Sequence, residues 1–158
     1  MALTADRLFV RPGAQVTLTA GAPSGLPVTW TVPGSAAATG TRTRARFAKS
    51  GRYVVTAVAT LPDGQTITAL AQITVDGTPP SVVVRRRGRI ALVTATDPGS
   101  GIATLVWRNG PGRVRAVTRR GVRLVPGVNR LAVTATDRSG NARTVRVRIV
   151  LPAPGVRR

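Results

Sequence analysis

Alternating apolar and polar residues run through most of the chain and predict β-strands with little else between them. In residues 129–150, two alternating runs flank the turn-forming residues 137–141 (DRSGN), so this stretch is predicted to be a β-hairpin. In the second run, the apolar residues from Val145 to Ile149 share one face, and Arg146 and Arg148 lie on the other. The pattern therefore predicts one face turned to a core and one basic face turned to solvent.

The first half of the chain repeats this alternation in short runs separated by proline and glycine. Arginine occupies every second position of one of these runs, opposite a face of Thr, Ala and Phe. Strands at this spacing, with turn signals between them, are typical of a sandwich or a barrel. The predicted strands of this half are residues 15–20, 26–32 and 41–47, followed by a hairpin of residues 52–60 and 65–75.

Residues 51–58 (GRYVVTAV) resemble the end of PKD-type and bacterial immunoglobulin-like domains. Trp30 occupies the place of the buried tryptophan of that family, and Tyr53 lies two residues before the position, here Val55, of the second cysteine of antibody domains. This placement suggests a tyrosine corner. Residues 30–34 (WTVPG) depart from the acidic aromatic-glycine motif of PKD domains. The resemblance covers the first half of the chain and implies a β-sandwich, with little about activity.

Proline marks the boundary between two predicted domains. A first PKD/Ig-like domain at residues 1–76 is followed by a Pro-rich linker at 77–80, because consecutive prolines cannot continue a central β-ladder. The strand pattern restarts in a basic Ig-like domain at 81–151, and an extended tail is predicted at 152–158. The fold class predicted for the whole chain is all-β, with two tandem immunoglobulin-like β-sandwich domains.

The second half contains an internal repeat. Residues 92–101 (LVTATDPGSG) and 131–140 (LAVTATDRSG) match each other, and the second copy continues into Asn141. Both resemble the ATD-x-x-SG and ATD-x-SGN hairpin ends of bacterial Ig-like modules in surface and virion proteins. The motif marks a fold rather than a chemistry. Trp107, with Leu105 on the same face, is predicted to be the core tryptophan of this domain.

The residue inventory argues against an enzyme. Acid–base and nucleophilic catalysis draw on a short list of side chains, and this chain has no His, no Cys and no Glu. A Ser-His-Asp arrangement, paired glutamates and a His-rich metal site are therefore excluded. The sequence predicts a non-enzymatic protein without a cofactor.

Two aspartates at predicted hairpin ends, Asp97 and Asp137, are candidate calcium ligands because Ca²⁺ prefers several oxygen ligands. A single carboxylate with no second acid nearby makes a poor site. The alternative is that each aspartate caps its own turn by accepting hydrogen bonds from backbone N–H groups. The sequence favours these caps, so no metal site is predicted.

Arginine placement carries the functional signal. The net charge is +19, and residues 79–158 alone hold 17 arginines against two aspartates. A surface of one sign indicates a negatively charged partner. Arginines recur at every second position of several predicted strands, with others on a nearby connection. The predicted partner-binding residues are Arg85, Arg87, Arg89, Arg113, Arg115, Arg119, Arg120, Arg123, Arg146 and Arg148.

Several partners fit this surface, because guanidinium groups bind carboxylates and phosphates alike. An acidic protein surface is favoured, and anionic glycans or cell-wall polymers are the alternative. Nucleic acid is less favoured because few aromatics are available for stacking and no recognition helix is predicted. Outward arginines that only solvate the sheets and block edge-to-edge pairing remain the non-functional interpretation.

The N-terminus lacks the charged and apolar regions of a secretory signal, and no apolar run has the roughly 18 residues of a membrane span. The sequence therefore predicts assembly in a cytoplasm and no membrane partner. Ig-like modules without a secretion signal resemble accessory virion proteins of tailed bacteriophages. This resemblance implies a capsid decoration or auxiliary virion protein, located in the virion, that docks on acidic capsid or tail subunits. A surface-adhesion module and a non-specific binder of duplex DNA are the alternatives.

Overall fold

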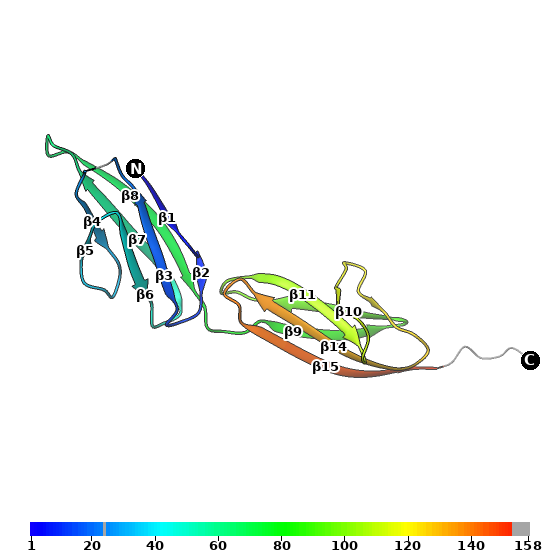
Figure 1. Cartoon of the computed structure of the whole chain (residues 1–158). Coiled ribbons are helices and arrows are strands. Elements are labelled where there is room, and N and C mark those ends of the chain that lie inside the picture. The colour runs from blue at the N-terminus through cyan, green and yellow to red at the C-terminus, as the bar shows by residue number, and fades with distance from the viewer. Residues whose placement is uncertain (24, 153–158) are drawn as a thin grey trace, which may run out of the picture. The chain divides into compact units, whose positions relative to one another are not determined.

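A computed structural model describes residues 1–23 and 25–152 of the chain. Every regular element in these residues is a β-strand, which confirms the predicted all-β class (Figure 1). The fold divides into two compact units, Met1–Gly77 and Thr78–Arg158, each of which is described by itself. The predicted tail lies outside the described residues, apart from Pro152. No helix in the described part is long and apolar enough to cross a membrane.

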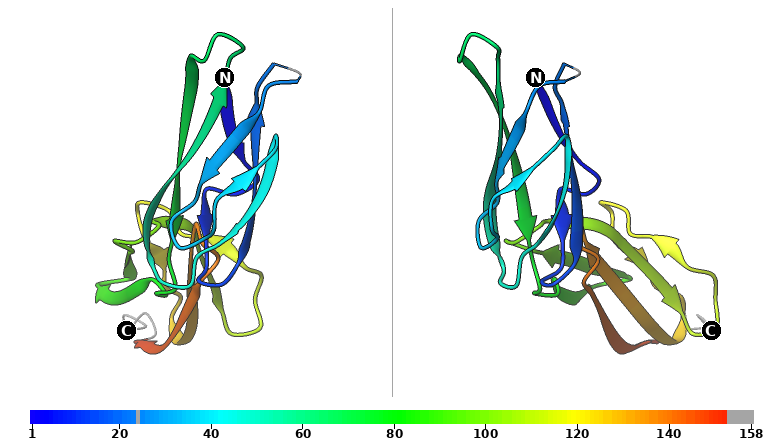
Figure 2. Two further views of the ribbon diagram at one scale, coloured as in Figure 1. Left: turned by 90° about the vertical axis from the view of Figure 1, so that its left-hand side faces the viewer. Right: turned by 60° about the vertical axis from the view of Figure 1, so that its left-hand side comes forward.

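The first unit is a sandwich of two sheets, which form separate layers in Figure 2. One sheet has the order β1-β3-β6, and the other has the order β2-β8-β7-β4-β5, in which only β2 and β8 pair in parallel. The hairpin predicted across residues 61–65 is formed by β7 and β8. The strands are β1 (Ala2–Ala5), β2 (Phe9–Val10), β3 (Gln15–Gly21), β4 (Val28–Thr31), β5 (Ala38–Thr39), β6 (Arg42–Arg46), β7 (Gly51–Thr60) and β8 (Thr66–Val75).

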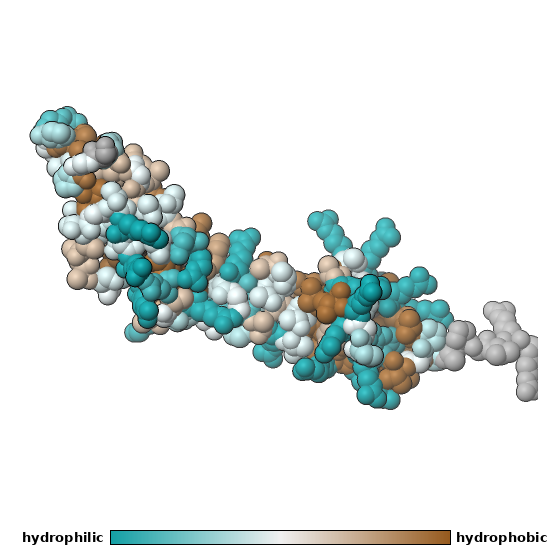
Figure 3. Space-filling model, in the orientation of Figure 1, coloured by the Kyte–Doolittle hydropathy of each residue, from teal (hydrophilic) through white to brown (hydrophobic). Residues whose placement is uncertain are grey.

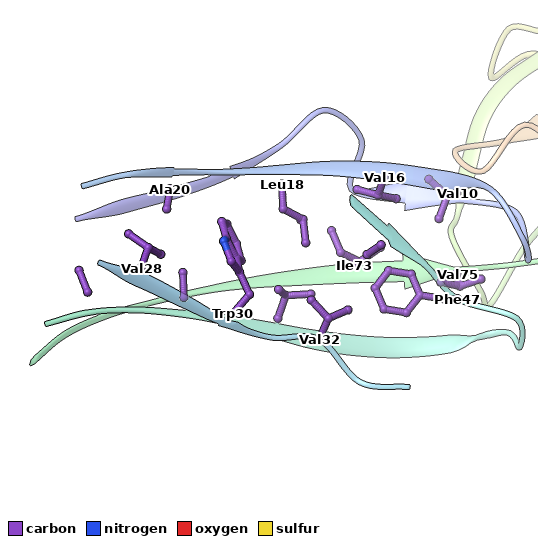
Figure 4. Packing of buried hydrophobic residues seen from close by; sticks show 14 residues of the cluster. Val10, Val16, Leu18, Ala20, Val28, Trp30, Val32, Phe47, Ile73 and Val75 are labelled. Atoms are coloured by element: carbon purple, nitrogen blue, oxygen red, sulfur yellow. The ribbon is translucent and has the colours of Figure 1, made fainter. Parts of the chain in front are cut away.

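Trp30 lies at the centre of the core of the first unit, as predicted (Figure 4). Its side chain is 0% exposed, and its indole N–H donates a hydrogen bond to the carbonyl of Gly40 at 2.7 Å. The tyrosine corner is also confirmed, because the Tyr53 hydroxyl donates to the carbonyl of Lys49 at 2.8 Å. The Tyr53 ring stacks on Phe47 with centroids 4.5 Å apart. One continuous apolar cluster therefore fills this unit.

The second unit repeats this arrangement without a counterpart of β2. Its sheets have the orders β9-β10-β13 and β12-β11-β14-β15. By position in the sheets, β11 corresponds to β4, and β13 corresponds to β6. The strands are β9 (Ser81–Arg87), β10 (Ile90–Thr96), β11 (Ile102–Asn109), β12 (Arg115–Ala116), β13 (Val122–Arg123), β14 (Gly127–Asp137) and β15 (Ala142–Leu151).

The two long sides of the second sandwich differ. On one side, the long strands β9 and β15 approach each other and close the gap between the sheets. On the other side, the edge strands β12 and β13 contain only two residues each. The apolar interior consists of two small clusters that share Trp107, one around Leu131 and one around Val133. The second unit therefore has one closed side and one open side.

Candidate anion-binding site

The ten predicted arginines are all exposed, but they do not form one surface. Arg146 and Arg148 lie on the outer face of the four-stranded sheet, and Arg85 and Arg87 lie on the outer face of the three-stranded sheet. The other six lie along the open side of the sandwich. The sequence pattern predicted arginines on outward strand faces, as a basic sheet surface or basic edges, and the structure places them in three separate basic regions. The six along the open side are Arg89, Arg113, Arg115, Arg119, Arg120 and Arg123.

Two of the assumed strand positions are wrong. Arg89 was expected to share a strand face with Arg85 and Arg87, but β9 ends at Arg87 and Arg89 lies in the turn before β10. Arg113 precedes the two-residue strand β12 instead of lying within a strand. Both residues sit in segments too short for alternation to determine which way a side chain points.

The outer face of the four-stranded sheet gathers two arginines that the sequence pattern missed. In the strand register, Arg108 on β11 and Arg146 on β15 both pair with Ala132 of β14 from either side, and Arg130 is directly opposite Arg148. We call Arg108, Arg130, Arg146 and Arg148 the outer-face arginines. They line a hollow of about 500 Å³ together with Gly110, Leu131, Ala132 and Val147.

This arrangement places like charges side by side. Like charges directly opposite each other on neighbouring strands destabilise a sheet, and Arg130 and Arg148 form such a pair. The nearest acid on β14 is Asp137, seven residues from Arg130, which in an extended strand is roughly 23 Å. That separation exceeds the Debye length of about 8 Å at physiological ionic strength. No acid of β14 therefore neutralises the outer-face arginines.

A second basic feature lies at the open side of the sandwich. A cleft of about 500 Å³ opens there, and we call it the Trp107 cleft. Its walls are apolar, and arginines from three different segments border it. The cleft is lined by Trp107, Asn109, Gly112, Leu124, Val125 and Pro126, with Arg89, Arg113, Arg115 and Arg123. Arg120 borders a neighbouring hollow that shares Arg89 and Arg123 with it.

The cleft exists because Trp107 is only partly covered. Trp30 on β4 and Trp107 on β11 occupy corresponding strands, yet Trp30 is fully buried and Trp107 is half-buried. In the first unit, the corresponding sheet edge is the five-residue strand β6, whereas β13 has two residues. The cross-strand neighbour of the tryptophan is also different, Ala38 in one unit and Arg115 in the other. Trp107 packs against both apolar clusters, as predicted for the core tryptophan of this domain, although its side chain is only half-buried.

A buried asparagine holds the floor of the cleft in place. Asn129 is 0% exposed, and its Oδ1 accepts hydrogen bonds from the side-chain amide of Asn109 at 3.0 Å and from the N–H of Val125 at 3.1 Å. Its Nδ2 donates to the carbonyl of Val125 at 2.8 Å. The N–H of Leu124 donates to the carbonyl of Arg89 at 2.9 Å, which ties the floor to the β9–β10 turn. These hydrogen bonds hold the backbone of Leu124 and Val125 against β14 and the β9–β10 turn.

The two acids of the second unit act as loop caps, as predicted. Asp97 Oδ1 accepts from the N–H groups of Ser100 and Gly101, each at 2.8 Å, and Asp137 accepts from the backbone and side chain of Asn141 at 2.8 and 2.7 Å. The expectation that neither has a second acid nearby is wrong, because their carboxylate oxygens lie within 4.8 Å of each other. The oxygens that cap these loops are already engaged by the protein.

The two copies of the repeated motif meet because their loops bond to each other. The N–H of Arg138 donates to the carbonyl of Gly101 at 3.0 Å, and the N–H of Ser139 donates to Ser100 Oγ at 3.4 Å. The carboxylates are consequently confined to the end of the sandwich where these loops lie. Hydrophilic side chains project around apolar patches over the rest of the visible face of the second unit (Figure 3).

Comparison with known proteins identifies the fold of the chain through one group of solved structures. No protein-family model matches the chain, and no curated protein matches it. Among solved structures, the chain is similar to the fibronectin(III)-like modules of Clostridium thermocellum CbhA, with 20% sequence identity, a TM-score of 0.56, and coverage of 95% of this chain and 94% of that chain. The finer resemblances to PKD-type and virion proteins stay predictions. The chain has the fold of fibronectin(III)-like modules, an immunoglobulin-like β-sandwich.

Proposed function

We propose that the protein is a non-enzymatic structural or binding protein whose second unit docks through arginines onto an acidic protein surface. The observation that carries the proposal is the outer-face pair of Arg130 and Arg148, two like charges held directly opposite each other. Such a pair costs stability in the free protein, and carboxylates of a partner relieve that cost through charge-assisted hydrogen bonds.

The proposed setting is a virion of a tailed bacteriophage, assembled in the host cytoplasm, where the chain acts as a capsid decoration or auxiliary virion protein. The resemblance of the residue 92–101 and 131–140 motifs to modules of virion proteins supports this setting. The partner is then an acidic surface of a capsid or tail subunit. Anionic glycans or wall polymers, and duplex DNA, are the competing partners.

Mass spectrometry of assemblies isolated from cells that express the chain tests the setting. We expect the chain in stoichiometric amount with a major capsid or tail protein, and we expect salt to release it because exposed charge pairs are screened. Retention on isolated cell walls would favour the glycan alternative. Retention on DNA-cellulose with a steep dependence on salt concentration would favour DNA binding.

A charge-matched pair of variants tests which arginines dock. Replacing Arg130 and Arg148 by glutamine should weaken retention on the assembly, whereas replacing Arg42 and Arg44 on β6 of the first unit should leave it nearly unchanged. Both variants remove two exposed positive charges, so the comparison separates a specific face from total charge. Equal losses in the two variants would contradict docking through the second unit.

A further inference from the structure

The Trp107 cleft combines the two residue types that most often dominate protein–protein binding energy. Tryptophan and arginine are enriched among interface residues whose truncation costs the most binding energy, and they act from well-packed pockets. Here an indole and the apolar side chains of Leu124, Val125 and Pro126 form the walls, with four arginines around them. Its volume of about 500 Å³ lies within the range of roughly 300–1,000 Å³ for ligand sites, as does that of the outer-face hollow.

The exposure of Trp107 is not forced by the fold. The first unit builds the corresponding position with a fully buried tryptophan whose N–H is bonded to Gly40. Within the described residues of the second unit, the Trp107 N–H has no hydrogen-bond acceptor. Apolar surface and an unpaired donor are therefore left at a place where arginines from three separate segments converge.

The mixed chemistry of the cleft favours a polypeptide as its occupant. β12 and β13 are the edge strands beside the cleft, but two residues each and an arginine in both limit pairing with another strand. A polypeptide can present an apolar side chain to the indole and carboxylates to the guanidinium groups, whereas an anionic glycan has no such apolar side chain. The surrounding guanidinium groups select for carboxylates on that chain.

We infer that the Trp107 cleft anchors an extended acidic segment of the partner protein, with one apolar side chain against Trp107 and carboxylates on Arg89, Arg113, Arg115 and Arg123. This role rests on the proposed docking to an acidic protein. Within that docking, the Trp107 cleft is the site that selects one partner segment over another. The outer-face arginines supply attraction over a wider surface, because electrostatic complementarity acts mainly on the rate of encounter. The cleft adds a contact that depends on side-chain shape.

Isothermal titration calorimetry of the full chain with two synthetic peptides tests the inference. One peptide has a phenylalanine between two runs of three glutamates, and the other has serine in place of the phenylalanine. Because burial of an apolar ring contributes about 1.5–3 kcal/mol, we expect the phenylalanine peptide to bind at least about tenfold more tightly. Equal affinity of the two peptides would overturn the inference and leave docking by charge alone intact.

Two variants of equal charge locate the binding. The double substitution Arg113→Gln with Arg115→Gln should weaken binding of the phenylalanine peptide at least about tenfold, since charge-assisted pairs are lost at the cleft. The control, Arg42→Gln with Arg44→Gln, lies on β6 of the first unit and should weaken it no more than about threefold through the general field. All four positions are exposed, and circular dichroism checks that both variants stay folded. Equal losses in both variants would refute a specific cleft.

Two competitors decide the chemical class. A sulfated oligosaccharide and a short oligothymidylate, matched in charge to the peptide, should bind less tightly than the phenylalanine peptide. If either binds more tightly and loses that binding in the Arg113/Arg115 variant, the cleft takes a glycan or a single-stranded nucleic acid and the inference is wrong. A different result would contradict the proposed function. In that case the chain would be absent from capsid or tail assemblies, independently of the affinities measured for the peptides.

Discussion

Asn129 is the residue on which the shape of the second unit depends most directly. A fully buried amide would cost free energy without hydrogen-bond partners, and here both ends of the amide are used. Its partners are the backbone of Val125 on the cleft floor and the side chain of Asn109, which also accepts from the N–H of Arg130 at 2.8 Å. One side chain thus joins the cleft to the strand that carries an outer-face arginine.

Replacing Asn129 with alanine should lower the free energy of unfolding of the second unit by about 2–4 kcal/mol, because the N–H and C=O of Val125 and the Asn109 amide lose buried partners. Denaturant unfolding followed by circular dichroism measures the change. The matched control is Val128→Ala, one position away on β14 and 48% exposed, which should cost less than about 0.5 kcal/mol. If Asn129→Ala lowers the free energy of unfolding no more than Val128→Ala does, the buried amide does not stabilise the second unit.

At the scale of elements, the shortness of β13 compared with β6 distinguishes the open side of the second sandwich from the same side of the first. The connection between them approaches β10 closely at Gly121, which has a φ of +79°. A Cβ atom at this position would lie 2.6 Å from the carbonyl oxygen of Ala91 and 2.9 Å from Ile90 Cγ2. Only glycine lets the chain pass here and still pair Val122 with Ala91.

Gly121→Ala should therefore destabilise the second unit by more than the roughly 1 kcal/mol that a left-handed backbone conformation costs an ordinary residue. Gly88→Ala is the control, since Gly88 has a φ of +58° with nothing within 4 Å of an added Cβ. Thermal unfolding of the two variants gives the comparison. Should Gly88→Ala lower the melting temperature as much as Gly121→Ala, backbone strain alone would explain both effects.

Alternation along the sequence predicted the long strands, since period-two patterning reports directly on which face is buried. β3, β4, β6, β7, β8, β14 and β15 all lie within two residues of the predicted runs. Alternation also placed both tryptophans on strands, whereas the tyrosine corner was suggested by the resemblance of residues 51–58 to immunoglobulin-like domains. These features depend on residues that are near one another in the chain.

What the sequence could not predict depends on pairing between distant segments. Arg108 and Arg130 join Arg146 and Arg148 only through the register of three strands, and no local pattern encodes that register. The half-burial of Trp107 follows from the length of β13 in the opposite sheet. The proximity of Asp97 to Asp137 follows from hydrogen bonds between two loops. Each of these is a property of the assembled sandwich.

At the scale of the whole molecule, charge imbalance is the dominant feature. The chain has 24 basic residues against five acids, and mutual repulsion among like charges destabilises a compact state. Raising NaCl from about 0.02 to about 0.3 M shortens the Debye length from roughly 20 to 6 Å and weakens that repulsion. We expect the melting temperature to rise over this range.

Differential scanning calorimetry measures this effect, and uncharged osmolyte at equal osmolality is the control. A soluble polyglutamate should raise the melting temperature at low salt, because a ligand that binds only the folded state stabilises it. A melting temperature that falls or stays constant as NaCl is added would mean that the arginines are not under repulsive strain. The proposed docking would then lose its energetic basis.

The bonded pair of loops at the end of the second unit constrains where the chain tolerates extra residues. An insertion between Gly99 and Ser100 would break the contacts with Arg138 and Ser139. Among residues 1–23 and 25–152, the tip of the β7–β8 hairpin makes local hydrogen bonds, such as that of Gln65 N–H to Asp63. A Gly-Ser dipeptide inserted after Pro62 should cost less than about 1 kcal/mol of stability, and one inserted after Gly99 clearly more. The hairpin tip is accordingly the place to attach a fluorophore, an epitope or a fused domain.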